Sequence, residues 1–438
     1  MLLLLALVLP GRCCSGAAAS TPDAWRQVPE ILARIVPPTF PERDFDIRRF
    51  GAVGDGTNDC TAAFAKAIAA CHRSGGGRVV VPAGKYSTGA IHLQSNVNLH
   101  LEKGATILFS TDPKKFLPLV FVRDAAELMN YSPFIYAFEQ TNVAVTGEGT
   151  LDGQASKSVW PEFVAKSKPD ADRLVAMGNQ EIPVRERLFG PGHFIRPNFV
   201  ELVRCRNVLL DGIRVVDSPM WELHPVYCTN VTVRGVNISS HGKNNDGCDP
   251  DSCRDVLIEN CTFDTGDDCI AVKSGRDHDG RRVNLPCENV VIRNCEFKDG
   301  HGGVTMGSET SGGIRNVFAE NCRFDSPNLD QALRFKTDSL RGGFIENIYI
   351  RNCTVKKART GIGMTMNYTK GAQGKFIPVV RDIDIRDCKF EMLLRQPIFI
   401  EGLSPSAEIT DVTIANCEFP SGSNENTITN AVRIHLIP

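Results

Sequence analysis

The sequence predicts an all-β fold: a single-domain right-handed parallel β-helix with an N-terminal capping helix. Three observations lead to this prediction. A short phrase recurs eight times between residues 207 and 417, with 23 to 35 residues from one phrase start to the next. The phrases carry short β-branched runs and no segment of helical length, whereas residues 61–72, upstream of them, are strongly helix-forming. Repeats of this kind stack into one body, so a length of 438 residues does not imply several domains.

Each phrase begins with Asn or Asp, continues with mostly apolar residues and ends at Cys or an aliphatic residue. The eight phrases are residues 207–213, 230–236, 255–261, 289–295, 316–322, 347–353, 382–388 and 411–417. A leucine-rich repeat would need recurring Leu and a helix in every unit, and a propeller would need a longer four-strand unit. Short strands separated by polar corners therefore favour the β-helix.

Two ladders of stacked side chains are expected along the coils. Six cysteines share one position of the phrase: Cys261, Cys295, Cys322, Cys353, Cys388 and Cys417. Side chains of equal phase point the same way, which suits buried free thiols better than disulfides. A second ladder is expected from the corner residues Asn260, Asn294, Asn321, Asn352 and Asn416, with unusual backbone angles and paired amides.

The N-terminal residues resemble a secretory signal, which predicts a secreted or periplasmic protein. Residues 1–19 hold an apolar run followed by small residues, too short to span a bilayer. We expect an N-terminal leader at 20–44 and a catalytic β-helix domain at 45–438, with no membrane span. The net charge of −2 gives no reason to expect nucleic acid as a partner. The oligomeric state is not predicted.

Two further segments have expected roles. The helix at about 61–72 follows a turn-rich stretch that can cap it, and it would close the open end of the stack. Residues of about 155–200 are richer in Pro, Arg and Lys than their surroundings. We expect this segment to be a loop inserted over one face.

Charged residues interrupt four consecutive repeats. Asp267 lies 12 residues after the phrase start at Asp255, and His301 lies 12 residues after the phrase start at Asn289. Adjacent parallel strands are ~4.8 Å apart, so residues of equal phase in neighbouring coils are near neighbours. We therefore expect Asp267 and His301 to be in contact.

Three carboxylates, those of Asp246, Asp267 and Asp268, are expected on the same wall. Their mutual repulsion should raise the pKa of at least one of them. One group can then act as an acid and another as a base at a single pH, as glycosidic hydrolysis requires. His301 stands among glycines, where it would hold or tune a carboxylate.

A basic pair follows in the next repeat. Arg334 and Lys336 alternate along a predicted strand, so they share one side of it. They form a clamp for an anionic group such as a sugar carboxylate, although a solvated, salt-bridged strand would have the same pattern. Lys273 is a further candidate for this clamp. We expect neither a metal nor a cofactor.

These residues resemble the motifs of glycoside hydrolase family 28, the polygalacturonases. The matching motifs, in the family's order, are Asn244-Asn245-Asp246, Gly266-Asp267-Asp268-Cys269, Gly300-His301-Gly302 and Arg334-Phe335-Lys336. The resemblance runs from about residue 45 to the C-terminus. It implies a pectin-degrading enzyme that acts on plant cell wall polysaccharide and hydrolyses α-1,4-galacturonosyl linkages with inversion.

The resemblance also implies roles for the residues. Asp267 would be the general acid, Asp246 and Asp268 would activate water, and His301 would belong to the catalytic group. Asn244, Arg334 and Lys336 would bind the substrate. The insertion is not part of compact endo-acting members, so we predict that it turns the groove into a pocket and makes the enzyme exo-acting, similar to bacterial exo-polygalacturonases.

Several alternatives remain open from the sequence. A rhamnogalacturonan or xylogalacturonan hydrolase of the same family would present the same motifs. A pectate lyase would keep the β-helix but use calcium and a basic residue. A polysaccharide-binding β-helix would keep the repeats and have little use for three crowded carboxylates.

Overall fold

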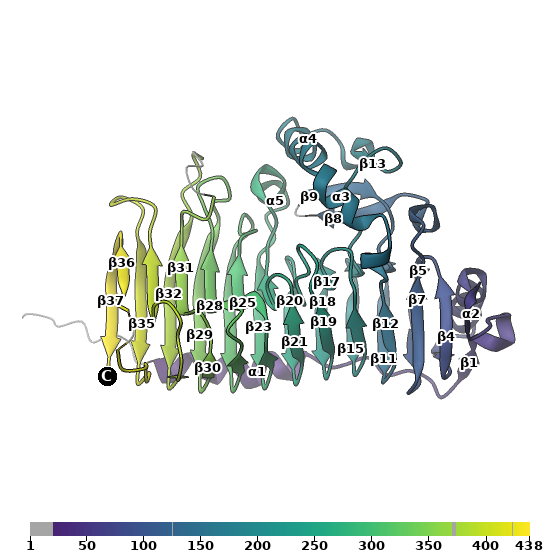
Figure 1. Ribbon diagram of the computed structural model, residues 1–438, viewed down its shortest axis with the longest axis horizontal. Helices are drawn as coiled ribbons and strands as arrows, with labels where there is room; N and C mark the ends of the chain where they lie inside the picture. The colour runs from purple at the N-terminus through teal and green to yellow at the C-terminus, as the bar shows by residue number, and fades with distance from the viewer. Residues whose placement is uncertain (1–20, 125, 370–373, 423) are drawn as a thin grey trace, which may run out of the picture.

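The protein is a long stack of β-coils with a helical lobe on one side. The computed structural model describes residues 21–124, 126–369, 374–422 and 424–438, so the expected signal segment at 1–19 lies outside the described residues. The coils follow one another along the long axis, from the N-terminal end at the right of Figure 1 to the C-terminus at the left. The predicted all-β, right-handed parallel β-helix is confirmed.

The stack has three faces, each built from parallel strands. The first face is a 13-stranded sheet of β1 (Asp44–Asp46), β3 (Gly77–Val81), β6 (Val97–Leu101), β11 (Thr141–Gly147), β15 (Arg206–Asp211), β18 (Thr229–Arg234), β20 (Arg254–Glu259), β23 (Cys287–Arg293), β26 (Ile314–Glu320), β29 (Phe344–Arg351), β32 (Val379–Arg386), β35 (Ile409–Ala415) and β37 (Ala431–Ile437). The second is an 11-stranded sheet of β2 (Asp55–Asp59), β4 (Gly84–Thr88), β7 (Ala105–Phe109), β12 (Thr150–Asp152), β16 (Arg214–Val216), β19 (Asn237–Ser240), β21 (Thr262–Thr265), β24 (Glu296–Phe297), β27 (Arg323–Asp325), β30 (Thr354–Lys357) and β33 (Lys389–Phe390).

The third face carries the polar residues singled out in the sequence. It joins a four-stranded sheet of β5 (Ile91–His92), β10 (Ile135–Phe138), β14 (Val200–Val203) and β17 (Leu223–Val226) to a six-stranded sheet of β22 (Ile270–Val272), β25 (Gly300–Gly307), β28 (Leu329–Lys336), β31 (Thr360–Thr365), β34 (Ile398–Glu401) and β36 (Thr427–Thr429). Bridges at Cys248, to Leu223 on one side and Ile270 on the other, make the two sheets continuous.

The interior is filled by aligned apolar side chains. On the first face, Val256, Val290 and Val317 are in register and fully buried. On the second face, the rings of Phe297 and Phe324 stack with centroids 4.6 Å apart. Because like residues lie above one another at the strand spacing, each coil buries its apolar side against the next.

The recurring phrase encodes the strands of the first face and their bends. The phrase-starting residue adopts a left-handed backbone, for example Asn230 at φ 59° and Asn289 at φ 57°. The corner residue does the same, with Asn260 at φ 55° and Asn294 at φ 54°. Asn and Asp tolerate this region better than most residues, which explains why they recur at both points.

The amide ladder lies at a different position from the expected one. Amide-to-amide hydrogen bonds join the phrase starts: Asn230 Nδ2 donates to Asn207 Oδ1 at 2.8 Å, and Asn316 Nδ2 donates to Asn289 Oδ1 at 3.2 Å. At the corners, Asn416 donates to Asp387. The prediction was right about the corner backbone and wrong about which asparagines pair, because sequence periodicity does not show which way a side chain turns at a bend.

The cysteine ladder is confirmed. All 14 cysteines of the described residues are free thiols, and all but the half-buried Cys417 are buried. In the predicted ladder each Sγ lies near the carbonyl oxygen two residues earlier, at 3.3 Å for Cys261 and 3.4 Å for Cys295. The thiols therefore pack as small apolar groups with a weak donor.

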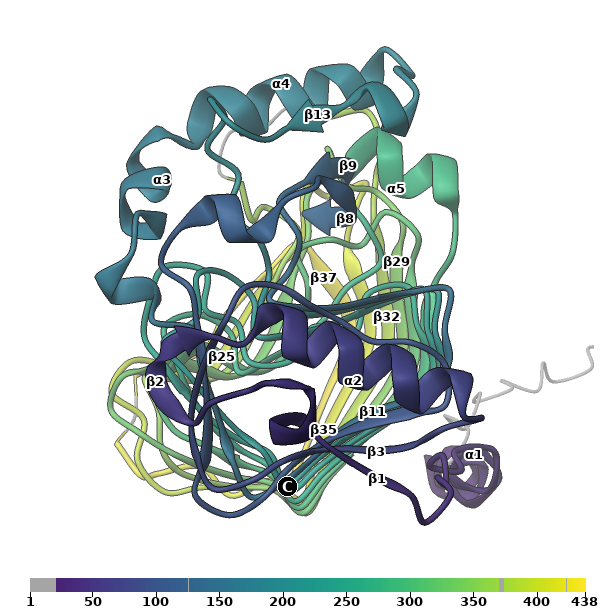
Figure 2. The same ribbon diagram turned by 90° about the vertical axis from the view of Figure 1, so that its right-hand side faces the viewer.

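The capping helix is also confirmed. Helix α2 (Thr61–Arg73) covers the N-terminal end of the stack (Figure 2). Its buried residues, including Phe64 and Ile68, recur on one side. The Asp59 carboxylate accepts a hydrogen bond from the backbone N–H of Thr61 at 2.9 Å, which caps the first turn.

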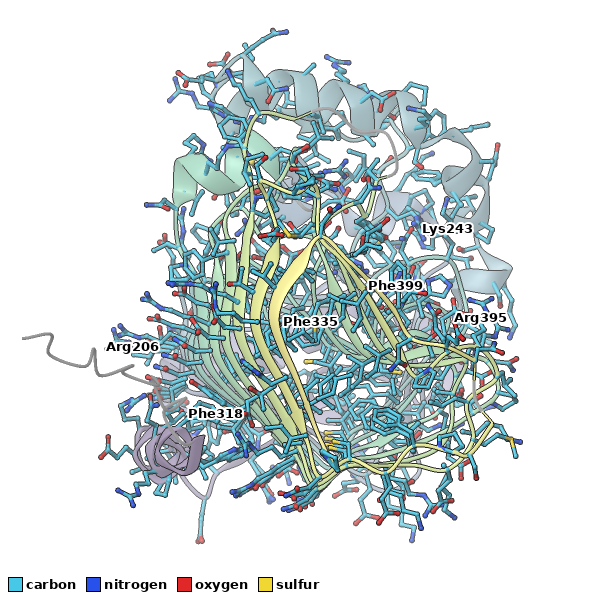
Figure 3. All side chains as sticks on the ribbon, turned by 90° about the vertical axis from the view of Figure 1, so that its left-hand side faces the viewer. Arg206, Lys243, Phe318, Phe335, Arg395 and Phe399 are labelled. Atoms are coloured by element: carbon cyan, nitrogen blue, oxygen red, sulfur yellow. The ribbon has the colours of Figure 1, made fainter. Side chains whose placement is uncertain are left out.

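The leader packs along the outside of the stack. It contains the 3₁₀ helix η1 (Thr21–Arg26) and helix α1 (Gln27–Arg34), followed by β1. Val28 and Ile31 of α1 pack against Phe318, which points out of the first face toward this helix (Figure 3).

The insertion is largely helical, where a loop was expected. It contains α3 (Trp160–Lys166), α4 (Lys168–Asn179) and the 3₁₀ turns η4 (Ala155–Lys157) and η5 (Val184–Glu186). Pro begins both helices at N1 or N2, a position that helices tolerate, so the Pro content did not signal loop.

A small sheet completes the lobe. It consists of β8 (Val120–Asp124), β9 (Ala126–Asn130) and β13 (Leu188–Phe189). Together with the helices it lies over the third face, beside α5 (Asp277–Val283) (Figures 1 and 2). Two short 3₁₀ turns, η2 (Ile47–Phe50) and η3 (Pro113–Phe116), lie in earlier coils. Within the described residues, none of the helices is long and apolar enough to cross a membrane.

Candidate active site

Two neighbouring coils bring the predicted acidic residues together where they enter the third face. Gly247 N donates to Asp268 O at 2.9 Å, so the chain segments that carry Asp246 and Asp268 run side by side. One oxygen from each of Asp246, Asp267 and Asp268 lies within 4.8 Å of the others. The expected cluster of three carboxylates is therefore present.

Asp267 and His301 are in direct contact, as their phase predicts. His301 N donates to Asp267 O at 2.9 Å, and His301 Nδ1 lies 2.9 Å from Asp267 Oδ1. Asp267 is half-buried, whereas His301 is half exposed. The hydrogen bond to the Asp267 carboxylate raises the pKa of His301 above its usual value. This face of the cluster is the part open to solvent.

Asp268 is fully buried and held by two cations. Arg334 Nη1 lies 2.9 Å from its Oδ1, and Lys336 Nζ lies 2.5 Å from its Oδ2. Thr305 Oγ1 donates to Oδ1 at 3.2 Å. Burial opposes the charged form, yet the charges of Lys336 and Arg334 hold the pKa of Asp268 well below its usual range. Asp268 is thus an ionised carboxylate.

The pKa of Asp246 is shifted in the opposite direction from that of Asp268. Its pKa is raised to about 7: burial raises it most, the charges of Asp267 and Asp268 also raise it, and the charge of Lys273 lowers it. One pKa is raised, as expected, but burial contributes more than repulsion. Within the described part of the chain, Asp246 Oδ1 has no hydrogen-bond partner. Neighbouring carboxylates with pKa values pushed apart are the arrangement that acid and base catalysis requires.

The glycine next to His301 is needed for close approach. A Cβ on Gly302 would lie 2.1 Å from Thr305 Oγ1 and 2.8 Å from Asp268 Oδ1. No side chain fits there without moving the buried carboxylate or its donor. The glycine therefore makes room for Asp268 and Thr305.

Arg334 and Lys336 lie on the same side of β28, as predicted. Arg334 is half-buried and Lys336 is buried. The exposed ring of Tyr368 lies over both, with its centroid 5.1 Å from Lys336 Nζ and 5.8 Å from Arg334 Cζ. Since both cations pair with Asp268, they hold this buried carboxylate as well as forming a positive wall.

Lys273 lies behind Asp246 and does not face outward with the basic pair. It is 2% exposed, and its Nζ lies 3.2 Å from Asp246 Oδ2 and 3.3 Å from Glu309 Oε2. Its ammonium group is paired with Asp246 and Glu309, and the expected place of Lys273 in the substrate clamp stays a prediction. The sequence placed Lys273 on the correct coil but could not show its depth.

Asn244 is held by the insertion. Arg196 Nη2 donates to Asn244 Oδ1 at 2.8 Å, and Arg196 Nη1 donates to the carbonyl oxygens of Lys243 and Pro219, each at 2.7 Å. The end of the inserted segment therefore braces the loop that leads to Asp246. A pocket of about 510 Å³ lies between α3 and this loop, with Arg196 and Lys243 among its lining residues (Figure 3).

Sequence reasoning missed three buried acids near Asp246 and Lys273. Glu222 and Asp249 are fully buried, and burial raises the pKa of each well above its usual value. Burial opposes the charge of Glu309, but Lys273 holds its pKa well below the usual range. An acidic residue inside the apolar run Trp221-Glu222-Leu223 was the available signal.

The donor set around the acids does not fit a calcium cage. Calcium takes six to eight oxygen ligands, whereas the oxygens of Asp268 receive Arg334 and Lys336, and Asp246 Oδ2 receives Lys273. A second group of His241, Asp264 and Asp299 could offer metal ligands further along the strands. The chemistry available at the acids is proton transfer at a site that carries positive charge.

The comparisons with known proteins agree with this chemistry. A family model described as Glycosyl hydrolases family 28 matches residues 191–435, more than half of the chain. A second model, Rhamnogalacturonase A/epimerase, pectate lyase-like, matches residues 45–102. The chain is 33% identical over 384 residues to a probable polygalacturonase of Vitis vinifera, covering 84% of this chain and 72% of that protein.

Two exo-acting proteins are among the relatives. The chain is 30% identical over 349 residues to an exo-poly-alpha-D-galacturonosidase of Dickeya chrysanthemi, covering 74% of this chain and 57% of that protein. The crystal structure of a hyperthermoactive exopolygalacturonase from Thermotoga maritima superimposes with a TM-score of 0.86 at 41% identity, covering 90% of each chain. The chain belongs to glycoside hydrolase family 28.

Proposed function

We propose that the protein is an exo-acting hydrolase of α-1,4-galacturonosyl linkages in polygalacturonate or oligogalacturonides. The observation that carries the proposal is the set of three carboxylates beside Arg334 and Lys336, in which the pKa values of Asp246 and Asp268 are shifted in opposite directions. The cations suit a substrate that carries a carboxylate on each ring. The relatives of Dickeya and Thermotoga supply the exo-acting precedent.

In the proposed mechanism, the solvent-exposed and the buried carboxylates have different roles. Asp267, open to solvent and in contact with His301, protonates the leaving glycosidic oxygen. Asp268, ionised by its two cations, draws the proton from the attacking water, and Asp246 orients that water. His301 stabilises Asp267 once it has given up its proton. Lys273 positions Asp246, while Asn244, Arg334 and Lys336 contact the sugar.

The insertion supports action at a chain end. Arg196 fixes the inserted lobe to the catalytic loop at Asn244, so the lobe stands beside the acids on the side of the earlier coils. A polymer that runs across the site would meet this lobe. A terminal residue fits without threading past it.

We also propose that the protein acts outside the cytoplasm. Pectic polymers are cell wall material, and the expected signal at residues 1–19 supports export. Mass spectrometry of the protein from the culture medium or periplasm tests this through the position of its N-terminus. A mature chain that still begins at Met1 would contradict it.

A panel of pectic fractions tests the substrate class. Polygalacturonate should be consumed fastest, with galacturonate as the first product and no absorbance from an unsaturated product. Chelation of divalent cations should leave the rate unchanged. If galacturonate is released first from rhamnogalacturonan or xylogalacturonan, that backbone is the substrate instead. An unsaturated product would show that the enzyme cleaves by elimination and not by hydrolysis.

A further inference from the structure

We propose that Asp124, at the end of β8, determines specificity by accepting hydrogen bonds from the hydroxyl groups of the terminal galacturonate, between the guanidinium groups of Arg196 and Arg276. The inference rests on the proposed exo action and names the group that recognises the chain end. It assigns to the lobe a direct contact with substrate in addition to blocking the groove.

The backbone before Asp124 is firmly anchored to the third face. Arg123 N donates to Glu201 Oε1 at 2.7 Å, and Arg123 O accepts from Asn198 Nδ2 at 3.2 Å. The guanidinium of Arg123 is 1% exposed and lies 3.3 Å from Asp251 Oδ1. The strand that carries Asp124 is therefore held in place by buried contacts, as a recognition group requires.

The Asp124 carboxylate can accept hydrogen bonds that the described part of the protein does not donate. It is half-buried, and within the described part of the chain it has no hydrogen-bond or ion-pair partner. Burial raises its pKa, and the nearby Arg196 and Arg276 act in the opposite direction. A partly buried carboxylate without hydrogen bonds loses solvation, which the hydroxyl groups of a sugar can restore.

Both flanking arginines lead to the catalytic acids. Arg196 Nη2 donates to Asn244 Oδ1, two residues before Asp246. Asn198, two residues after Arg196, donates to the carbonyl oxygen of Arg123, next to Asp124. On the other flank, the charge of Arg276 acts on Glu309, which pairs with Lys273 beside Asp246. Asp124 thus stands across a pair of cations from the reacting centre, where a terminal ring and its carboxylate fit.

The enclosed ring belongs to the non-reducing end. The general acid Asp267 and His301 serve the leaving group, and they lie toward the later coils. The lobe lies over the earlier coils (Figure 1), and Asp246 belongs to the coil before that of Asp267. A terminal ring on that side has a free hydroxyl at C4, which an internal ring has given up to its linkage. The Asp124 carboxylate accepts a hydrogen bond from this hydroxyl group.

A pair of substrates isolates this contact. Trigalacturonate has the terminal 4-hydroxyl, and the 4,5-unsaturated trimer lacks it. We expect the wild type to prefer the saturated trimer. Asp124→Ala should lower kcat/KM for the saturated trimer by roughly 10- to 100-fold, the loss expected for hydrogen bonds to a charged group, and change the unsaturated trimer little. Asp124→Asn keeps the shape and should show an intermediate loss.

Controls separate the possible outcomes. Asp172→Asn changes an exposed aspartate on α4 of the same lobe and should leave both rates as in the wild type. An unchanged preference in both Asp124 variants would overturn the inference. If the wild type itself releases mixed oligomers from polygalacturonate, the exo proposal fails. Should Asp124→Ala not fold, as judged by its melting temperature, the preference of Asp124→Asn alone decides the question.

Discussion

His301 Nδ1 lies 2.9 Å from Asp267 Oδ1, on the one part of the acidic cluster that is open to solvent. The contact pairs the proposed general acid with a histidine on the next coil. It also explains why both residues follow their phrase starts by the same number of residues. Its consequences for catalysis can be measured directly.

Removing the proton donor should abolish turnover and leave binding intact. Asp267→Asn keeps the shape of the side chain but has no proton to give, so kcat should fall by about 10²- to 10⁴-fold. Reducing-end release measures the rate, and calorimetry with trigalacturonate measures binding. A variant that retains wild-type turnover would show that Asp267 is not the acid.

The pH dependence of kcat/KM should reflect the ionisation of His301. Because Asp267 raises its pKa, the His301 cation and its interaction with Asp267 are complete below the ordinary histidine value of about 6.5. They are lost as pH rises through the raised value. His301→Gln should remove this alkaline limb from the kcat/KM profile and lower the maximum. An unchanged limb in His301→Gln would assign it to another group.

The ionised form of Asp246 should destabilise the folded protein at neutral pH. Its pKa of about 7 in the folded protein exceeds the unfolded value of about 3.9, so stability falls as pH rises between these values. Asp246→Asn should therefore be inactive, yet its free energy of unfolding at pH 8 should exceed that of the wild type by at most about 4 kcal/mol, with a higher melting temperature. At pH 4 its stability should be little changed. Thermal melts across this range provide the measurement, and a lower melting temperature at pH 8 would contradict the assignment.

Asp268 and Lys336 should behave as a buried pair. Lys336→Met leaves a buried carboxylate with one cation fewer and should cost about 3–5 kcal/mol. The double variant Asp268→Asn/Lys336→Met should recover much of that stability while remaining inactive. Chemical denaturation of the two single variants and the double variant gives the coupling. Additive losses would show that the pair is not a stabilising unit.

Product stereochemistry tests the division of roles. The family resemblance implies inversion, so proton NMR within the first turnovers should show the β-anomer from the α-linkage. The nearest oxygens of the acids lie within 4.8 Å, closer than the about 6.5–9.5 Å usual between the carboxyl groups of inverting glycosidases. An initial α-anomer would make one of these carboxylates a nucleophile.

Periodicity predicted the features that repeat along the stack. The phase of Asp267 and His301, the thiol ladder from Cys261 onward and the capping helix all follow from local pattern. The pairing asparagines did not, because the turn of a side chain at a bend depends on the neighbouring coil. The depth of Lys273 could not be predicted for the same reason, because it is set by ion pairs with Asp246, Asp249 and Glu309 from other coils.

The lobe was the least predictable part. Its helices bury Trp160 and Leu174 against residues distant in the sequence, and short helices leave little periodicity to detect. Asp124 carried no motif and lies in a hairpin far upstream of the catalytic repeats. Only the fold shows that its strand is hydrogen-bonded to the segment that carries Arg196.

The most direct test of exo-hydrolysis follows viscosity and reducing ends together on long polygalacturonate. An end-acting hydrolase should release galacturonate as the sole early product, while viscosity stays near its starting value at several per cent bond cleavage. A rapid fall in viscosity with mixed oligomers at the same extent of cleavage would contradict the account.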